Sequence, residues 1–125
     1  MLLIITEIEI TNENIGKVNL RIPDSLQLQC EYSGPLQPDF VWYKDNTRIT
    51  ENSGYNQTVS ITWKSNRVQS IAILRKDNTQ YSDAGLYTCA DTMSRQNKSV
   101  SVYAGMYVSL VCFPKKGFNF EVLCI

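Results

Sequence analysis

The stretch DAGLYTC, residues 83–89, places an acid, a glycine, a tyrosine and a cysteine at every second position. A period of two is the spacing of a β-strand, in which alternate side chains share one face. Tyr87 and Cys89 are therefore predicted to point into one core, and Asp83 and Gly85 to sit in the tight corner that leads into the strand. This arrangement calls for a second cysteine elsewhere in the chain.

The same alternation recurs along the chain in short segments that are separated by turn residues. The segment 33–38 is predicted as a loop because it contains a glycine and two prolines, and 45–48 is predicted as a turn. Short strands at this spacing, without any helical period, predict an all-β fold of two packed sheets. The predicted strands cover residues 6–11, 17–22, 25–32, 40–44, 58–63, 68–74, 85–91 and 99–103.

Two residues upstream extend the opening stretch into a longer array. Cys30 lies in the centre of one predicted strand, and Trp42 lies on the next. With the opening stretch they form the pattern Cys…Trp…Asp-x-Gly-x-Tyr-x-Cys, which resembles the signature of immunoglobulin-like domains of the variable or intermediate type. The resemblance covers residues 6–104 and implies a two-sheet antiparallel β-sandwich with Greek-key topology. Residues 105–125 are left as an unassigned C-terminal tail.

The resemblance implies a structural role for each residue of this array. Cys30 and Cys89 would form a disulfide between the two sheets, closing a loop of about 60 residues and contributing on the order of 4 kcal/mol to stability. Trp42 would pack against this bridge, and the hydroxyl of Tyr87 would bond to backbone at the corner. These residues would build the fold rather than bind a partner.

The chain departs from the resembled pattern close to Asp83. The resemblance implies an ion pair between Asp83 and an arginine, for which Arg67 and Arg75 are both candidates. Thr79 stands where an apolar residue is usual, and the segment 74–83 is longer than usual, which predicts a bulge or a longer connection. The spacing between the two cysteines of the array leaves the subtype open.

Composition argues against several classes of function. Twelve basic and twelve acidic residues give a formal net charge of zero, which does not favour binding to nucleic acid or to an anionic membrane. The absence of histidine removes the commonest general base and the commonest zinc ligand. The four cysteines form no C-x-x-C pair, so that we expect no metal site. We also expect no catalytic residue, cofactor or small-molecule substrate.

Two N-x-[ST] sequons suggest exposed glycosylation sites. Asn56 begins the triplet NQT immediately before a predicted strand, and Asn97 begins NKS at the end of the loop 92–97. Both asparagines are candidates for N-linked glycan if the chain enters the secretory pathway. The alternative is that both triplets arise by chance in segments rich in Asn, Ser and Thr.

The first candidate surface for partner binding is the outward face of the predicted sheet that contains Trp42 and Cys89. Charge is scarce on it and tyrosine, which is common at protein interfaces, is present. The alternative is an ordinary solvated sheet with scattered apolar residues. The loops 32–39 and 92–97, at one end of such a sandwich, are a second candidate surface. By alternation, the residues expected on the outward face are Val41, Tyr43, Thr88, Ala90, Ser101 and Tyr103.

These features favour an extracellular or cell-surface recognition or adhesion module that binds a protein, either homophilically or as receptor and ligand. The alternative is a structural spacer domain of a long intracellular muscle or cytoskeletal protein. The sequence shows no signal peptide and no membrane-spanning stretch, so we expect a piece of a longer protein that reaches a membrane only through segments outside this chain. The pairing of Cys112 and Cys124 in the tail stays open.

Overall fold

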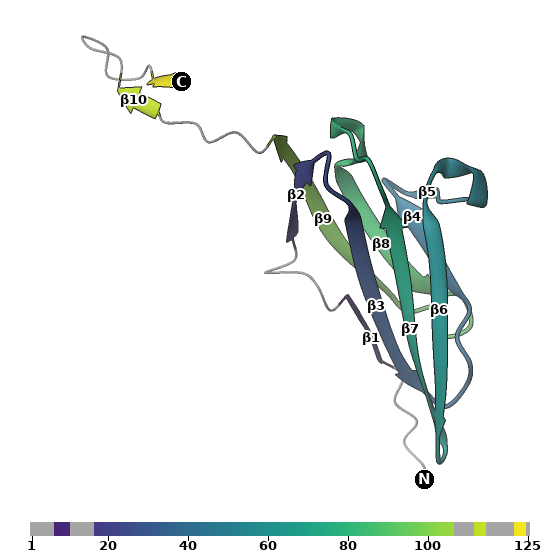
Figure 1. The fold of residues 1–125 in the computed structure, drawn as a ribbon. Helices are drawn as coiled ribbons and strands as arrows, with labels where there is room; N and C mark the ends of the chain where they lie inside the picture. The colour runs from purple at the N-terminus through teal and green to yellow at the C-terminus, as the bar shows by residue number, and fades with distance from the viewer. Residues whose placement is uncertain (1–6, 11–16, 107–111, 115–121, 125) are drawn as a thin grey trace.

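The computed structural model describes residues 7–10, 17–106, 112–114 and 122–124, and in these ranges the chain forms a two-layer β-sandwich (Figure 1). The four-stranded sheet has the order β1 (Glu7–Ile10), β3 (Leu26–Gly34), β7 (Arg67–Lys76), β6 (Asn56–Lys64). The five-stranded sheet has the order β2 (Lys17–Ile22), β9 (Asn97–Met106), β8 (Gly85–Asp91), β4 (Phe40–Lys44), β5 (Thr47–Arg48). All pairs in both sheets are antiparallel except β2 with β9, which are parallel.

This architecture confirms the predicted all-β, two-sheet antiparallel immunoglobulin-like sandwich. The strands at 17–22 and 40–44 begin and end where the alternation predicted them. Two short 3₁₀ helices, η1 (Glu51–Ser53) and η2 (Tyr81–Asp83), lie between strands.

The tail contributes two short strands that pair with each other in a separate sheet. These are β10 (Cys112–Pro114) and β11 (Val122–Cys124), which run antiparallel. Their register places the backbone of Cys112 opposite that of Cys124. The side chains of these two strands, and the remainder of the tail beyond Met106, lie outside the residues whose side chains are described.

One detail of the strand prediction was wrong. The segment 45–48, predicted as a turn, ends in the two-residue strand β5, because Asp45 and Asn46 adopt positive φ angles of 48° and 67° and turn the chain tightly back onto β4. Of the two alternatives predicted near Asp83, the structure has the longer connection. The strand β7 keeps one continuous register with both β3 and β6, and the extra residues follow Lys76 in the connection that contains η2.

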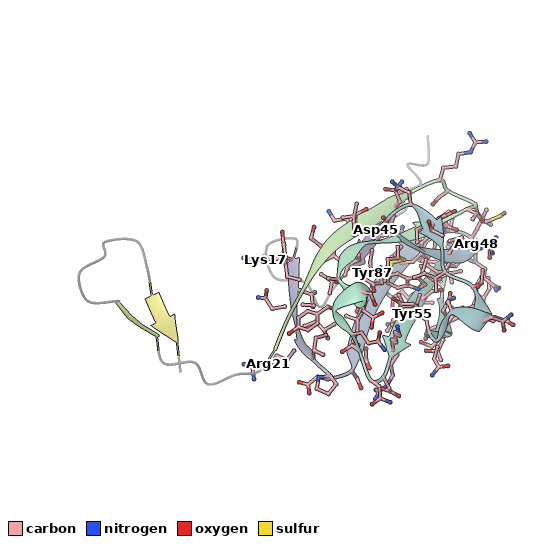
Figure 2. The ribbon with its side chains drawn as sticks, turned by 90° about the horizontal axis from the view of Figure 1, so that it is seen from above. Lys17, Arg21, Asp45, Arg48, Tyr55 and Tyr87 are labelled. Atoms are coloured by element: carbon pink, nitrogen blue, oxygen red, sulfur yellow. A yellow bond between two sulfur atoms is a disulfide. The ribbon has the colours of Figure 1, made fainter. Side chains whose placement is uncertain are left out.

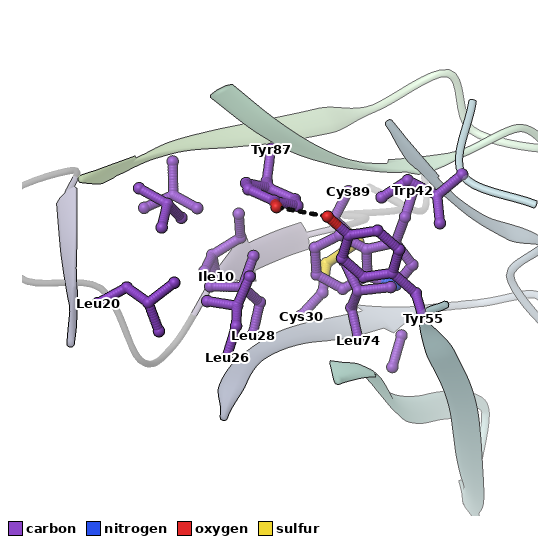
Figure 3. Packing of buried hydrophobic residues seen from close by; sticks show 14 residues of the cluster. Ile10, Leu20, Leu26, Leu28, Cys30, Trp42, Tyr55, Leu74, Tyr87 and Cys89 are labelled. Carbon is purple, nitrogen blue, oxygen red and sulfur yellow. Dashed lines mark hydrogen bonds between the residues drawn. A yellow bond between two sulfur atoms is a disulfide. The ribbon is translucent and has the colours of Figure 1, made fainter. Parts of the chain in front are cut away.

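The core lies between the sheets around one disulfide. Cys30 on β3 and Cys89 on β8 are bonded across the two layers, and both are fully buried. Figure 3 shows Trp42 beside this bridge, with an exposed fraction of 1%. Alternation on β3 explains the packing, because every second residue from Leu26 to Tyr32 is buried while those between are half-buried or exposed.

Candidate interaction surface

The corner before β8 is held by a buried pair of tyrosines. The hydroxyl of Tyr87 donates to the backbone carbonyl of Asp83 at 2.5 Å, and it lies 2.7 Å from the hydroxyl of Tyr55 (Figure 3). Burial raises the pKa of both phenols above the ordinary value, and the hydrogen bond between the two hydroxyls raises that of Tyr87 further. The tyrosine that the opening stretch singled out therefore fixes the backbone of the corner, as the resemblance implied.

The ion-pair partner of Asp83 is Lys76 rather than an arginine. The ammonium of Lys76 lies 2.5 Å from the carboxylate of Asp83, and the backbone N–H of Gln80 donates to the other carboxylate oxygen at 2.7 Å. Arg67 instead donates to the hydroxyl of Ser33. Arg75 pairs with the exposed Asp77 at 3.1 Å.

The physical reason is side-chain direction along β7. Arg75 is exposed and Lys76, at the end of the strand, is half-buried next to the corner, so only Lys76 reaches the buried carboxylate. The ammonium of Lys76 also lies 5.2 Å from the centre of the Tyr55 ring, a cation–π distance. Lysine, aspartate and both tyrosines thus form one connected corner.

Thr79 fills the usual apolar position without leaving its hydroxyl unpaired. The residue is only 2% exposed, and its hydroxyl donates to the backbone carbonyl of Asp24. A buried threonine is tolerated there because its polar atom has a partner.

By contrast, the hydroxyl of Ser70 on β7 is buried and has no hydrogen-bond partner within the described residues.

The outward face of the five-stranded sheet carries most of the residues predicted for partner contact. Tyr43, Thr88 and Ala90 are half-buried there, and Tyr103 is 57% exposed. Val41 is a correction, because only 6% of it is exposed. It lines a groove beside β4 and β5, together with Phe40 and Arg48.

A shallow depression lies in the middle of this face. Its volume is ≈ 390 Å³, and it spans β4, the β4–β5 turn, β8 and the start of β9. The hydroxyls of Thr88 and Ser99 bond to each other across its floor at 2.7 Å. Every residue that lines it is uncharged: Tyr43, Asn46, Leu86, Thr88, Ala90, Asn97 and Ser99.

The turn that bounds this depression is fixed by a carboxylate. Asp45 accepts a hydrogen bond from the backbone N–H of Leu86 at 2.9 Å. Gly85 lies against it with φ of 155°, and a Cβ atom at this position would approach the Asp45 carboxylate to 2.7 Å. The backbone angle therefore favours glycine at position 85, and a Cβ atom there would also displace the Asp45 carboxylate.

The two loops at the end of the sandwich are joined by Asp91, a residue that the sequence reasoning did not assign to any structural role. One of its carboxylate oxygens accepts from the backbone N–H of Asp39 at 2.8 Å and of Met93 at 3.1 Å. The other accepts from the backbone N–H and hydroxyl of Ser94, at 3.1 and 2.7 Å. Burial acts to raise the pKa of Asp91, but the hydrogen bonds from Ser94, Asp39 and Met93 lower it on balance.

Both predicted sequon asparagines lie on the surface. Asn56 is the first residue of β6 and Asn97 the first of β9, and both are exposed. Asn97 also lines the depression, so a glycan on it would cover one end of that surface.

The described residues lack two features that other classes of protein require. No group of three or more histidine, cysteine, aspartate or glutamate residues that could hold a metal ion occurs among them. Nor do they include a helix of the length and hydrophobicity that a membrane crossing requires.

The described residues form an all-β two-sheet module with a disulfide and a hydrogen-bonded tyrosine corner in its core. The family model for the immunoglobulin domain matches residues 17–102, and the chain belongs to this family. The order of strands agrees, because the four-stranded sheet matches the larger sheet of constant-type domains, and the five-stranded sheet adds β2 and β5 at the two edges of their three-stranded sheet.

Relatives and solved structures of this family include receptors and muscle proteins. Vascular endothelial growth factor receptor 2 of Danio rerio is 40% identical over 80 residues, which are 64% of this chain and 5% of the receptor. A Dpr2 structure in complex with DIP-Theta matches 80% of this chain and 32% of its own chain, with TM-score 0.64 and 17% identity. Titin domains A168–A170 match 83% of this chain and 35% of theirs, with TM-score 0.61 and 17% identity.

Proposed function

We propose that this chain is one extracellular immunoglobulin module of a cell-surface receptor or adhesion protein, and that it binds a protein partner through the outward face of the five-stranded sheet. The binding is non-covalent and involves no chemical step. The uncharged depression in that face is the observation that carries the proposal. The binding module comprises residues 6–104 together with Gly105 and Met106, which complete β9, and the remaining residues to 125 are a tail outside it.

The composition of the depression supports contact with protein. Interface centres are depleted in charge and enriched in aromatic residues, and here Tyr43 and Leu86 surround a floor of small residues. Tyr103 lies further along the same sheet, 57% exposed. A face of this kind presents at most about 800 Å² to one partner, so that a single domain binds modestly and tandem copies raise the avidity.

The comparisons support the extracellular setting. Vascular endothelial growth factor receptors of several vertebrates are among the relatives, and the Dpr2 structure shows immunoglobulin domains in a complex with those of DIP-Theta. The predicted glycosylation at Asn56 and Asn97 fits the same setting, because both side chains reach the solvent.

A cell-binding experiment with two matched variants tests the proposal. The full chain is displayed as a labelled tetramer and applied to a panel of vertebrate cell lines. Leu86→Lys places a charge in the depression, where Leu86 is 40% exposed, and Ile61→Lys makes the same change at a 37% exposed site on the other sheet. We expect Leu86→Lys to reduce staining at least tenfold and Ile61→Lys to leave it unchanged. Equal staining by wild type and Leu86→Lys would overturn the assignment of this face.

A further inference from the structure

The strand β6 forms an open edge of the four-stranded sheet. It pairs along its whole length with β7, and no strand of the described residues lies on its other side. All nine of its residues are exposed. At about 3.3 Å per residue, this leaves roughly 30 Å of outward N–H and C=O groups available to a further strand.

The other edges of the two sandwich sheets carry features that oppose pairing with a second chain. The strand β1 has only four residues, two of them glutamates, and β5 has only two residues, one of them Arg48. The strand β2 carries Lys17 and Arg21, both exposed (Figure 2). Short length and charge are how natural sheets protect their edges.

The β6 edge has neither form of protection. From Asn56 to Trp63 it contains no charged residue and no proline, and its first charge is Lys64 at the last position. It is also long for a strand, since most strands have about five or six residues. A strand without charge can lie against an identical strand without electrostatic repulsion.

An apolar stripe runs along this same edge. Val59, Ile61 and Trp63 are 51%, 37% and 65% exposed. Their register partners on β7, which are Ala72, Ser70 and Val68, are all buried. The stripe therefore lies on the core-facing side of the sheet, at a margin that the five-stranded sheet does not cover.

We propose that two copies of this chain associate through antiparallel pairing of their β6 edges, with Ile61 on the two-fold axis. Position n of one strand then faces position 122 − n of the other. Val59 faces Trp63 of the second copy, so that each apolar stripe covers the other with a β-branched residue against an aromatic ring.

This register suits a symmetric contact. Ser60 faces Thr62 and Thr58 faces Lys64, so that no two like charges meet. The same patch serves both copies, as a two-fold interface requires, and the two four-stranded sheets become one continuous sheet. One strand supplies fewer contacts than the 20–30 residues per side of a standard interface, so the dissociation constant is on the order of 10–100 μM in solution. Confinement of the protein on one membrane would strengthen it.

Sedimentation of the full chain over a range of concentrations tests the pairing. Wild type is expected to pass from monomer to dimer near the stated constant, and Ile61→Lys to remain monomeric up to at least a tenfold higher concentration. Tyr81→Lys, at a 54% exposed site outside both proposed surfaces, is the matched control and is expected to dimerise like wild type. A wild type that stays monomeric at about 1 mM, or a dimer that survives Ile61→Lys, would overturn the proposal.

A second pair of variants tests the same interface in case Ile61→Lys fails to fold. Ser60→Asn completes an N-x-[ST] sequon with Thr62, so that a glycan attached in a eukaryotic host would stand in the middle of the edge. Both Ser60 variants carry Asn56→Gln as well, so that no other glycan is attached to β6. The glycosylated protein is expected to be monomeric, while Ser60→Gln, which creates no sequon, is expected to dimerise. If the glycosylated protein dimerises as well as Ser60→Gln, β6 is not the interface. Cell staining tests the depression in the five-stranded sheet, whereas sedimentation tests the β6 edge. Either proposal can therefore fail while the other stands.

Discussion

Replacing Asp91 by asparagine is expected to destabilise the end of the sandwich that carries the loops 32–39 and 92–97. The carboxylate accepts hydrogen bonds from Asp39, Met93 and Ser94, two at each oxygen. Asparagine retains one acceptor oxygen and turns an NH₂ group toward the donors at the other. Two donors therefore lose their acceptor, and the remaining two lose the negative charge.

The magnitude follows from the burial of the site. Asp91 is only 1% exposed, and a buried donor left without an acceptor costs about 1–3 kcal/mol. Two such donors lose their acceptor in Asp91→Asn. One of them can reach water because Ser94 is only half-buried, so the expected loss in the free energy of unfolding is about 2–4 kcal/mol. Asp77→Asn is the control. Its carboxylate is exposed, so the midpoint is expected to move much less.

Urea unfolding followed by tryptophan fluorescence measures the loss. The pH dependence supplies an independent check, because the hydrogen bonds hold the pKa of Asp91 below its ordinary value in the folded state. Its contribution to stability is then complete above the unfolded pKa near 3.9 and is lost as the pH falls through the lower folded pKa. A loss smaller than about 0.5 kcal/mol at neutral pH, or an unchanged acid limb in Asp91→Asn, would refute the reasoning.

Three further substitutions probe the corner, the turn and the core. Tyr87→Phe removes the hydroxyl that donates to Asp83 and is expected to cost about 1–3 kcal/mol by urea unfolding, while a loss below 0.5 kcal/mol would show that the hydrogen bond contributes little. Gly85→Ala is expected to lower stability by about 1–3 kcal/mol, because the new Cβ meets the Asp45 carboxylate, and a thermal midpoint equal to that of wild type would contradict this. Ser70→Ala removes a buried hydroxyl without a partner and is expected to be neutral or to stabilise by up to about 1 kcal/mol, so that clear destabilisation would point to an unseen partner.

The sandwich and its disulfide could be predicted because they depend on local alternation and on residue types of restricted use. Cys30, Trp42, Tyr87 and Cys89 each have a side chain that fits a single place in such a core, and all four are at most 1% exposed. Alternation also located most strands within a few residues, since a period of two survives without knowledge of the neighbouring strands.

Alternation alone could not show which apolar face is covered. Val59, Ile61 and Trp63 alternate as regularly as the residues of β3, yet they are exposed, because burial depends on how far the opposite sheet extends. Val41 shows the opposite case: alternation predicts that it is exposed on the outward face, and it is only 6% exposed. In both cases burial depends on tertiary packing rather than on the strand itself.

The polar partners were the hardest to predict. Lys76 could not be preferred to Arg67 or Arg75 without the direction of each side chain on β7, because all three carry the charge that Asp83 needs. The sequence indicates the role of Asp91 only weakly, through the position of an acid at the end of a predicted strand, just before the polar stretch TMSRQN. Its bond to Asp39 joins residues 52 positions apart, which no local pattern indicates.

The central claim, an extracellular immunoglobulin module, is tested most directly by the intact mass of the chain secreted from a eukaryotic host behind an added signal peptide. Mass is measured with and without a glycan-removing enzyme, and after alkylation of the denatured but unreduced protein. The account predicts glycan on Asn56 or Asn97, and Cys30 and Cys89 protected from the label by their bond. Failure of secretion, or an unglycosylated product in which both cysteines are alkylated, would contradict it and favour an intracellular spacer.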